Sequence, residues 1–302
     1  MILLAEMTDS SKIWLLDGGM GQELIARSPT PPTGLWATQV LLDFPELVKA
    51  VHDDYFQAGA EIATTNTYAI HHDRLEPYGL DDKFADLQHQ ACTLAVKARD
   101  EHGGGLVAGS LGPLGWSYRP ELAFPFEEAA ERYAEIVKLQ APYVDFFLAE
   151  TMSSLEQARA AVLGAQTASK PVWLAVSVDD DNGTELRSGE KVADLVSLAK
   201  TLGIDTVLVN CSTPEAVSQA LAQLVNQGLT IGAYANGFSK ISDNYKTKGS
   251  TVDALETRQD LSPQVYADFV NDWLILGTNI VGGCCEVGPA HIREIALRLS
   301  KL

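Results

Sequence analysis

Short apolar runs recur along this chain and are separated by longer amphipathic stretches. Eight of the runs are five to seven residues long and rich in β-branched or aromatic residues, which is typical of buried strands. They are KIWLLD (12–17), EIATTN (61–66), LVAGS (106–110), DFFLAE (145–150), VWLAVS (172–177), TVLVN (206–210), TIGAYAN (230–236) and NIVGG (279–283).

The stretches between these runs carry apolar residues at helical spacing. Examples are FEEAAERYAEIVKLQA (126–141), SLEQARAAVLGAQTA (154–168), KVADLVSLAKTLG (191–203) and TPEAVSQALAQLVNQG (213–228). The last opens on Thr213-Pro214, a helix-start signal, and closes on Gly228, a stop signal. Strands that alternate with helices predict a parallel sheet. Eight such units in 302 residues favour a (β/α)8 barrel, one domain over 1–302, rather than an open sheet.

Composition agrees with a globular α/β protein. The 302 residues are 46% hydrophobic, enough for a large core. No apolar run approaches the roughly 18 residues that span a bilayer. The N-terminal segment lacks the basic start and long apolar part of a secretory signal. We therefore expect a cytoplasmic protein with no membrane partner, in which the four cysteines stay reduced.

The formal charge is −18, from 22 basic and 40 acidic residues. Such a surface repels nucleic acid and acidic membranes, so neither is expected as a partner. The excess of acid is explained by solubility, and we expect a monomer or a small homo-oligomer.

Polar residues follow the predicted strands. Active sites of these barrels are built at the carboxyl ends of the strands. The residues at these ends are Asp17, Thr65, Asn66, Ser110, Glu150, Ser177, Asn210, Cys211, Asn236, Gly283, Cys284 and Cys285. The pattern predicts a polar site at one end of the barrel.

Three of the four cysteines belong to this set. Cys211 follows the sixth run, whereas Cys284 and Cys285 follow the eighth, so one strand separates them. Three thiolates with one open position are typical of catalytic zinc, which soft sulfur ligands select. Gly282 and Gly283 precede the pair and allow the backbone to approach an ion closely.

The alternative is that these cysteines are ordinary thiols of the barrel core. Cys92 differs from the other three, because it lies inside a predicted helix, FADLQHQACTLAVKAR (84–99). It is predicted to be a small buried hydrophobe without a chemical role.

Six motifs resemble the homocysteine S-methyltransferase family, in the family's order and over nearly the whole chain. They are LLDGGMGQEL (15–24), TTNTY (64–68), GSLGP (109–113), AET (149–151), VNCSTP (209–214) and GGCC (282–285). The resemblance implies an enzyme, a zinc-bearing barrel that transfers a methyl group to the sulfur of homocysteine and forms methionine.

The resemblance also implies roles for single residues. Cys211, Cys284 and Cys285 match the family's zinc ligands, and no catalytic side chain is expected beyond this zinc site. Asp17 and Glu150 match residues that hold the amino-acid end of homocysteine. The predicted substrate-binding set is Asp17, Gly18, Glu150, Asn210 and Asn236. The family stretch around the last of these usually has proline where Ala235 stands.

The expected methyl donor is a sulfonium, S-methylmethionine or S-adenosylmethionine. Because the sequence ends soon after its last predicted helix, we expect neither a cobalamin or folate domain nor the C-terminal extension of the betaine-using branch. Trp116, Tyr118 and Tyr234 are candidates to face a sulfonium cation, although core packing explains them equally well. The segment 237–261 is predicted to be either a lid or a surface loop.

Three other functions stay open from the sequence. One is a methyltransferase of the same fold acting on a related thiol or selenol. Another is a non-catalytic zinc- or thiol-binding barrel. The third is a lyase or aldolase, which requires a Schiff-base lysine or a carboxylate metal cluster at a strand end. None of the eight predicted strands ends in lysine.

Overall fold

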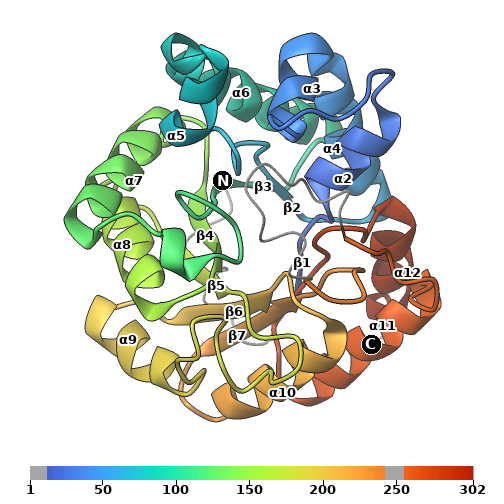
Figure 1. Ribbon diagram of the computed structural model, residues 1–302. Helices are drawn as coiled ribbons and strands as arrows, with labels where there is room; N and C mark the ends of the chain where they lie inside the picture. The colour runs from blue at the N-terminus through green and yellow to red at the C-terminus, as the bar shows by residue number, and fades with distance from the viewer. Residues whose placement is uncertain (1–11, 242–254, 302) are drawn as a thin grey trace.

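The computed structural model describes residues 12–241 and 255–301, and within them eight parallel strands form a nearly closed barrel (Figure 1). Their order around the sheet is β1-β8-β7-β6-β5-β4-β3-β2, and a bridge between Leu16 and Ile62 joins the two ends. The strands are β1 (Trp14–Leu15), β2 (Ile62–Thr64), β3 (Leu106–Leu111), β4 (Phe146–Met152), β5 (Val172–Val176), β6 (Thr206–Asn210), β7 (Thr230–Tyr234) and β8 (Ile280–Val281).

Helices surround this ring of strands on the outside (Figure 1). They are α2 (Met20–Arg27), α3 (Ala37–Asp43), α4 (Pro45–Ala58), α5 (His72–Leu75), α6 (Phe84–His102), α7 (Phe126–Gln140), α8 (Leu155–Gln166), α9 (Asp194–Leu202), α10 (Pro214–Leu224), α11 (Pro263–Ile275) and α12 (Pro289–Leu299). Short 3-10 turns are η1 (Glu76–Tyr78), η2 (Asp81–Lys83) and η3 (Pro120–Leu122). The (β/α)8 barrel predicted from the sequence is confirmed, and each predicted run overlaps one strand, with β3 and β4 extending past their runs to Leu111 and Met152.

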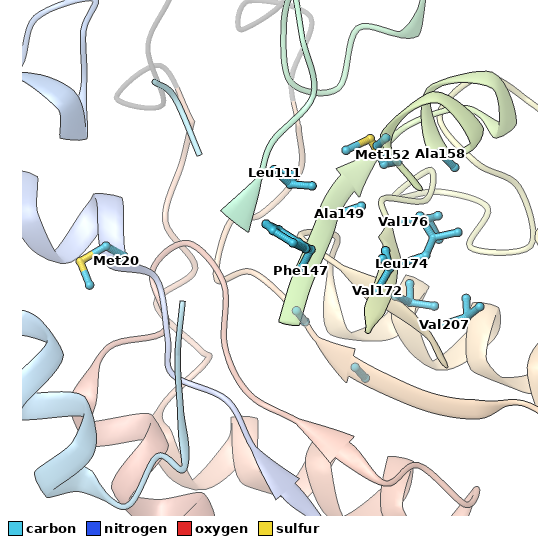
Figure 2. Packing of buried hydrophobic residues seen from close by; sticks show 14 of the residues in the cluster. Met20, Leu111, Phe147, Ala149, Met152, Ala158, Val172, Leu174, Val176 and Val207 are labelled. Carbon is cyan, nitrogen blue, oxygen red and sulfur yellow. The ribbon is translucent and has the colours of Figure 1, made fainter. Parts of the chain in front are cut away.

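Two apolar layers hold the barrel together, because successive side chains of a strand point to opposite faces. In β4, Phe146 and Leu148 belong to the cluster inside the barrel. Phe147 and Ala149 belong to the larger cluster between the sheet and the helices, part of which Figure 2 shows beside β5. The same alternation directs Glu150 inward, which explains how an acidic residue at the end of a buried strand reaches the interior.

Helix α10 begins as predicted and ends earlier. Thr213 caps it by accepting a hydrogen bond from the amide of Ala216 (3.4 Å), and Pro214 is its first residue. The helix ends at Leu224 because Val225 is extended, and Asn226 turns the chain with a φ of 60°. The predicted stop, Gly228, therefore lies in the connection after the helix.

Two connections at the carboxyl ends of the strands matter for the site. Between β5 and α9 the chain makes a small antiparallel excursion, with bridges between Val178 and Leu186 and between Glu185 and Lys191. Of the segment 237–261, residues 242–254 lie outside the described part, so the lid prediction falls largely there. Its two flanks pair through a bridge between Phe238 and Thr257.

Cys92 is fully buried in α6, as predicted, and burial raises the pKa of its thiol to about 12. Among the helices of the described residues, none is long and apolar enough to cross a membrane.

Candidate active site

The three cysteines predicted to lie together do so. Cys211 directly follows β6, and Cys284 and Cys285 come shortly after β8. Their sulfurs all lie within 4.8 Å of one another, and the Sγ atoms of Cys211 and Cys285 are 3.9 Å apart. Zinc–sulfur bonds of about 2.3 Å in a tetrahedron place neighbouring sulfurs about 3.8 Å apart. The free thiols thus have the spacing of three corners of a tetrahedral metal site.

Glycines bring the backbones around this cluster into close contact. A Cβ atom on Gly18 would lie 2.1 Å from the carbonyl oxygen of Val287, and one on Gly19 would lie 2.4 Å from that of Cys284. Both distances exclude any larger residue. The loop that carries Asp17 is therefore packed directly against the loop that carries the adjacent cysteines.

The glycines before the cysteine pair have a related role. A Cβ on Gly282 would meet the side chain of Leu16 at 2.6 Å, and one on Gly283 would meet that of Val287 at 2.2 Å. Close packing is what requires glycine at these two positions, whereas the positive φ in this loop belongs to Glu286 (66°).

The sulfur of Cys211 has a polar neighbour outside the cysteine cluster. The hydroxyl of Tyr118 lies 3.0 Å from its sulfur. Burial raises the pKa of the Cys211 thiol, but hydrogen bonds from Cys284, Cys285 and Tyr118 outweigh burial and hold this pKa well below its ordinary value. The hydrogen bonds with Cys211, together with burial, hold the pKa values of the Cys284 and Cys285 thiols well above the ordinary value of a cysteine.

A buried ion pair supports the backbone of Cys211. The guanidinium of Arg187 lies 3.1 Å from the carboxylate of Asp180, with side-chain exposures of 8% and 2%. Arg187 also donates to the carbonyl oxygen of Cys211 (3.4 Å) and stacks over the ring of Tyr118, 4.8 Å from its centre. Both residues come from the excursion after β5.

Asp17 is a buried carboxyl at the end of the first strand. It accepts hydrogen bonds from the amide (2.7 Å) and the hydroxyl (2.8 Å) of Thr64. Burial raises its pKa to about 7 despite these bonds, and the charge of Glu150 adds to the effect.

Glu150 is the second buried carboxyl. The hydroxyls of Ser110 (2.5 Å) and Tyr234 (3.1 Å) donate to its two oxygens. Burial again raises the pKa to about 7, with a further contribution from Cys211. Two carboxyls that titrate near neutral pH thus lie beside three sulfurs.

The three cysteines and the two buried carboxyls, with Thr64 and Ser110, line one cavity. Besides the groups above, its lining includes the aromatic side chains Trp36, Tyr68, Trp116, Tyr118 and Tyr234. The cavity lies at the carboxyl ends of the strands, where the sequence predicted a polar site.

The residues predicted to bind substrate fall into two groups. Asp17, Gly18 and Glu150 line the cavity, whereas Asn210 and Asn236 lie outside its lining. The amide group of Asn210 accepts from the Thr151 amide (3.0 Å) and donates to the Thr151 hydroxyl (2.9 Å).

Asn236 is likewise used within the fold. Its side-chain oxygen accepts from the backbone amide of Phe238 (3.2 Å), and its backbone amide donates to the carbonyl oxygen of Ser212 (3.0 Å). Both asparagines thus brace the chain just beyond their strands.

Thr64 and Arg74 are lining residues that the sequence analysis did not single out. Thr64 belongs to the predicted run 61–66 and is the first residue of the TTNTY motif, which was the available signal. Arg74 lies in the short helix α5, in the connection after β2, and no sequence pattern distinguishes it from a surface arginine.

Comparison with known proteins gives the family. The model of the family described as homocysteine S-methyltransferase matches residues 14–299, almost the entire chain. The chain belongs to the homocysteine S-methyltransferase family. This confirms the resemblance carried by the six sequence motifs.

Members of the family resemble this chain along its whole length. A homocysteine S-methyltransferase of Escherichia coli (strain K12) is 30% identical, over 98% of both chains. The homocysteine S-methyltransferase YbgG of Bacillus subtilis (strain 168) is 27% identical, over 97% of this chain and 96% of that protein. A methionine synthase of Mycobacterium tuberculosis is 29% identical over 97% of this chain, which spans only 25% of that longer protein.

A solved structure agrees with these sequence matches. The metallated form of the homocysteine methyltransferase MmuM from Escherichia coli aligns with a TM-score of 0.80 and 27% identity, covering 98% of this chain and 99% of that one.

Proposed function

We propose that this chain is a zinc-dependent homocysteine S-methyltransferase that uses a sulfonium donor and forms methionine, with residues 1–302 acting as one homocysteine-binding domain. The observation that best supports this proposal is the cluster of three cysteine sulfurs, spaced for tetrahedral coordination, in a cavity shared with two buried carboxyls. Family membership supports the same reaction.

Cys211, Cys284 and Cys285 would hold the metal. Three sulfur ligands favour zinc over magnesium or calcium, and leave the fourth position for a substrate atom. When bound, zinc deprotonates a coordinating thiol. A free thiol with a pKa near 8.5 is only about 3% thiolate at pH 7, so full ionisation is a gain of roughly 30-fold, or about 2 kcal/mol.

Asp17 and Glu150 would bind the ammonium group of homocysteine. Each is poised near its pKa of about 7 in the free protein, so an arriving cation stabilises the ionised form. The hydroxyls of Ser110 and Tyr234 fix the carboxylate of Glu150, and Thr64 fixes that of Asp17. Asn210 and Asn236 would act as supports behind these contacts.

The aromatic part of the cavity would hold the sulfonium donor. Ring faces attract a sulfonium cation, and a site lined by them contains little water. The homocysteine thiolate attacks the methyl carbon, and the bond between that carbon and the donor sulfur breaks with its electrons left on the donor. Opposite charges merge in this step, so a dry site favours it, and alignment of the two sulfurs and the methyl contributes a further large factor.

A methyl-transfer assay on zinc-replete protein tests the proposal. Homocysteine is combined with S-methylmethionine, S-adenosylmethionine or betaine, and methionine is measured. We expect turnover with a sulfonium and none with betaine. Stoichiometric zinc without turnover of any donor would instead favour a non-catalytic binding protein, and turnover only with another thiol or a selenol would change the acceptor.

We place this reaction in the cytoplasm, because the three thiols must stay reduced to bind a metal.

A further inference from the structure

Arg74 is the basic side chain in the lining of the cavity. It belongs to α5, in the connection after β2, and is half-buried. Its Nε and Nη2 atoms are enclosed, and no hydrogen-bond partner occurs for either among residues 12–241 and 255–301. Buried guanidinium donors without a partner are costly, so they indicate an anion that completes the site.

Asp73, the acidic residue next to Arg74, does not supply this anion. Asp73 directs its Oδ2 atom to the amide of Gly115 (3.1 Å), while its Oδ1 atom is buried without a hydrogen bond. In the described part of the chain, no ion pair is formed between Arg74 and a carboxylate within 4 Å. Arg74 is instead held by Trp116, since its guanidinium lies over that ring, 5.5 Å from the centre.

Trp116 links Arg74 to the cysteines. The ring packs against the apolar cluster that contains Tyr118, Cys211 and Cys285. The two acids of the lining, Asp17 and Glu150, lie at strand ends, and the pKa of Glu150 is affected directly by Cys211. The cavity therefore has acids beside the sulfurs and a base on the other side of an aromatic ring.

We propose that Arg74 binds the α-carboxylate of the methyl donor, so that the site selects an amino-acid sulfonium over a simple one. This inference rests on the proposed function. The acceptor must place its sulfur at the cysteines and its ammonium group at the two acids. In-line transfer puts the donor sulfonium beyond that sulfur, among the rings, and the donor's short amino-acid chain then extends toward Arg74.

The guanidinium suits this ligand. Its planar fork binds both oxygens of a carboxylate, and the Trp116 ring lies beside the guanidinium, 5.5 Å from its centre. Charge-assisted hydrogen bonds of this kind correspond to roughly 10- to 150-fold in binding or in kcat/KM. Discrimination of this size is measurable with a donor that lacks only the carboxylate.

The test compares S-methylmethionine with its α-carboxamide, which keeps the sulfonium and the ammonium group. Donor kcat/KM is measured at saturating homocysteine for the unaltered protein, Arg74→Met and Arg74→Lys. We expect Arg74→Met to lower kcat/KM roughly 10- to 150-fold with S-methylmethionine and to leave the carboxamide within about threefold. Arg74→Lys should recover part of the preference, because it restores charge but not the fork.

Arg159→Met is the matched control. Arg159 also stacks on an aromatic ring, 4.3 Å from the centre of Phe126, but it is exposed and lies outside the cavity lining. Equal losses with both donors in Arg74→Met would overturn the proposal, and so would a rise confined to the KM of homocysteine.

Failure of the proposed function has a different signature. If the unaltered protein transfers no methyl group, equilibrium binding of S-methylmethionine and its carboxamide to the zinc protein decides the role of Arg74. A preference for the carboxylate that disappears in Arg74→Met would support the role of Arg74 while the proposed reaction fails. Equal binding of both compounds would overturn it.

Discussion

The hydroxyl of Tyr118 lies 3.0 Å from the sulfur of Cys211, although the two residues follow different strands, β3 and β6. Both have backbones in the left-handed region, with φ values of 62° and 48°. Such conformations cost about 1–3 kcal/mol each and persist where surrounding contacts enforce them. Here Arg187, held by Asp180, contacts both residues and supports these conformations.

Tyr118→Phe should keep the cysteine cluster but weaken its hold on metal. The phenol donates to a sulfur that would ligate zinc, and loss of such an outer contact typically lowers metal affinity or activity 10- to 100-fold. Competition with a chromophoric chelator measures the affinity, and the thiolate-to-metal band of the cobalt-substituted protein reports the change at sulfur. Unchanged affinity and an unchanged band would show that the contact is only packing.

The three cysteines should each be required for metal. Cys211→Ala, Cys284→Ala and Cys285→Ala are expected to reduce zinc from about one per chain to near none, because a tetrahedral site cannot hold zinc firmly with two protein ligands. Metal analysis of the purified variants provides the measurement.

Cys92→Ala is the matched control, since Cys92 is buried in α6 away from the cavity lining. It should retain its zinc. Full occupancy in any of the three cluster variants would remove that cysteine from the ligand set.

The eight strands were predictable because a strand buried on both faces must be apolar throughout, and such runs are visible in the sequence. The cysteine cluster was predictable because thiol side chains are rare and the barrel topology places alternate strand ends near one another. It was harder to predict from the sequence whether Asn210 and Asn236 face the cavity. Asn210 ends β6, but the left-handed turn at Cys211 aims the sulfur at the cavity and leaves the amide with Thr151.

The contacts of Arg74 and Tyr118 could not be predicted from the sequence, for a different reason. Both lie in connections that have no periodic pattern, so the sequence does not show which of their atoms face the cavity. Their roles depend on how the loops after β2 and β3 fold over the barrel. Tyr118 was predicted only as one of several aromatic candidates, and its contact with a cysteine was not foreseen.

Glu150→Gln should retain zinc but bind homocysteine more weakly. Loss of a charge-assisted hydrogen bond to the ammonium group corresponds to about 1.5–3 kcal/mol, or roughly 10- to 150-fold in kcat/KM. The difference should shrink as the pH falls, because the Glu150 carboxyl, with a pKa of about 7, becomes neutral like glutamine. Kinetics at several pH values give the ratio. A ratio that stays constant below neutral pH would contradict the ionic role.

The same substitution should stabilise the metal-free protein at alkaline pH. Glu150 has a folded pKa of about 7 against an ordinary value of 4.5, so the folded state holds its proton more tightly. The contribution of this group to stability is complete below about pH 4.5 and is lost as the pH rises through about 7. Above that, neutral glutamine is favoured by up to about 3 kcal/mol.

Denaturant unfolding in the presence of a chelator measures this effect. The stability difference between Glu150→Gln and the unaltered protein should grow with pH. Glu131→Gln, at an exposed position of α7, should show no such trend. A difference for Glu150→Gln that does not depend on pH would mean that hydrogen bonds, rather than buried charge, dominate at this position.

The sulfur of homocysteine should join the three protein sulfurs around the metal. The spacing of the cysteines leaves one corner of a tetrahedron for it, and the two carboxyls in the same cavity would hold the other end of the molecule. Methionine has the same amino-acid end, but its thioether carries no charge and cannot ionise, so it is a poor ligand and leaves readily. X-ray absorption of the zinc protein distinguishes bound homocysteine from bound methionine. The number of sulfur atoms around zinc should rise by about one with homocysteine, to the four ligands of a tetrahedral site, and should stay unchanged with methionine. A count that stays fixed with homocysteine while methyl transfer proceeds would make the metal structural and assign activation of the thiol to another group.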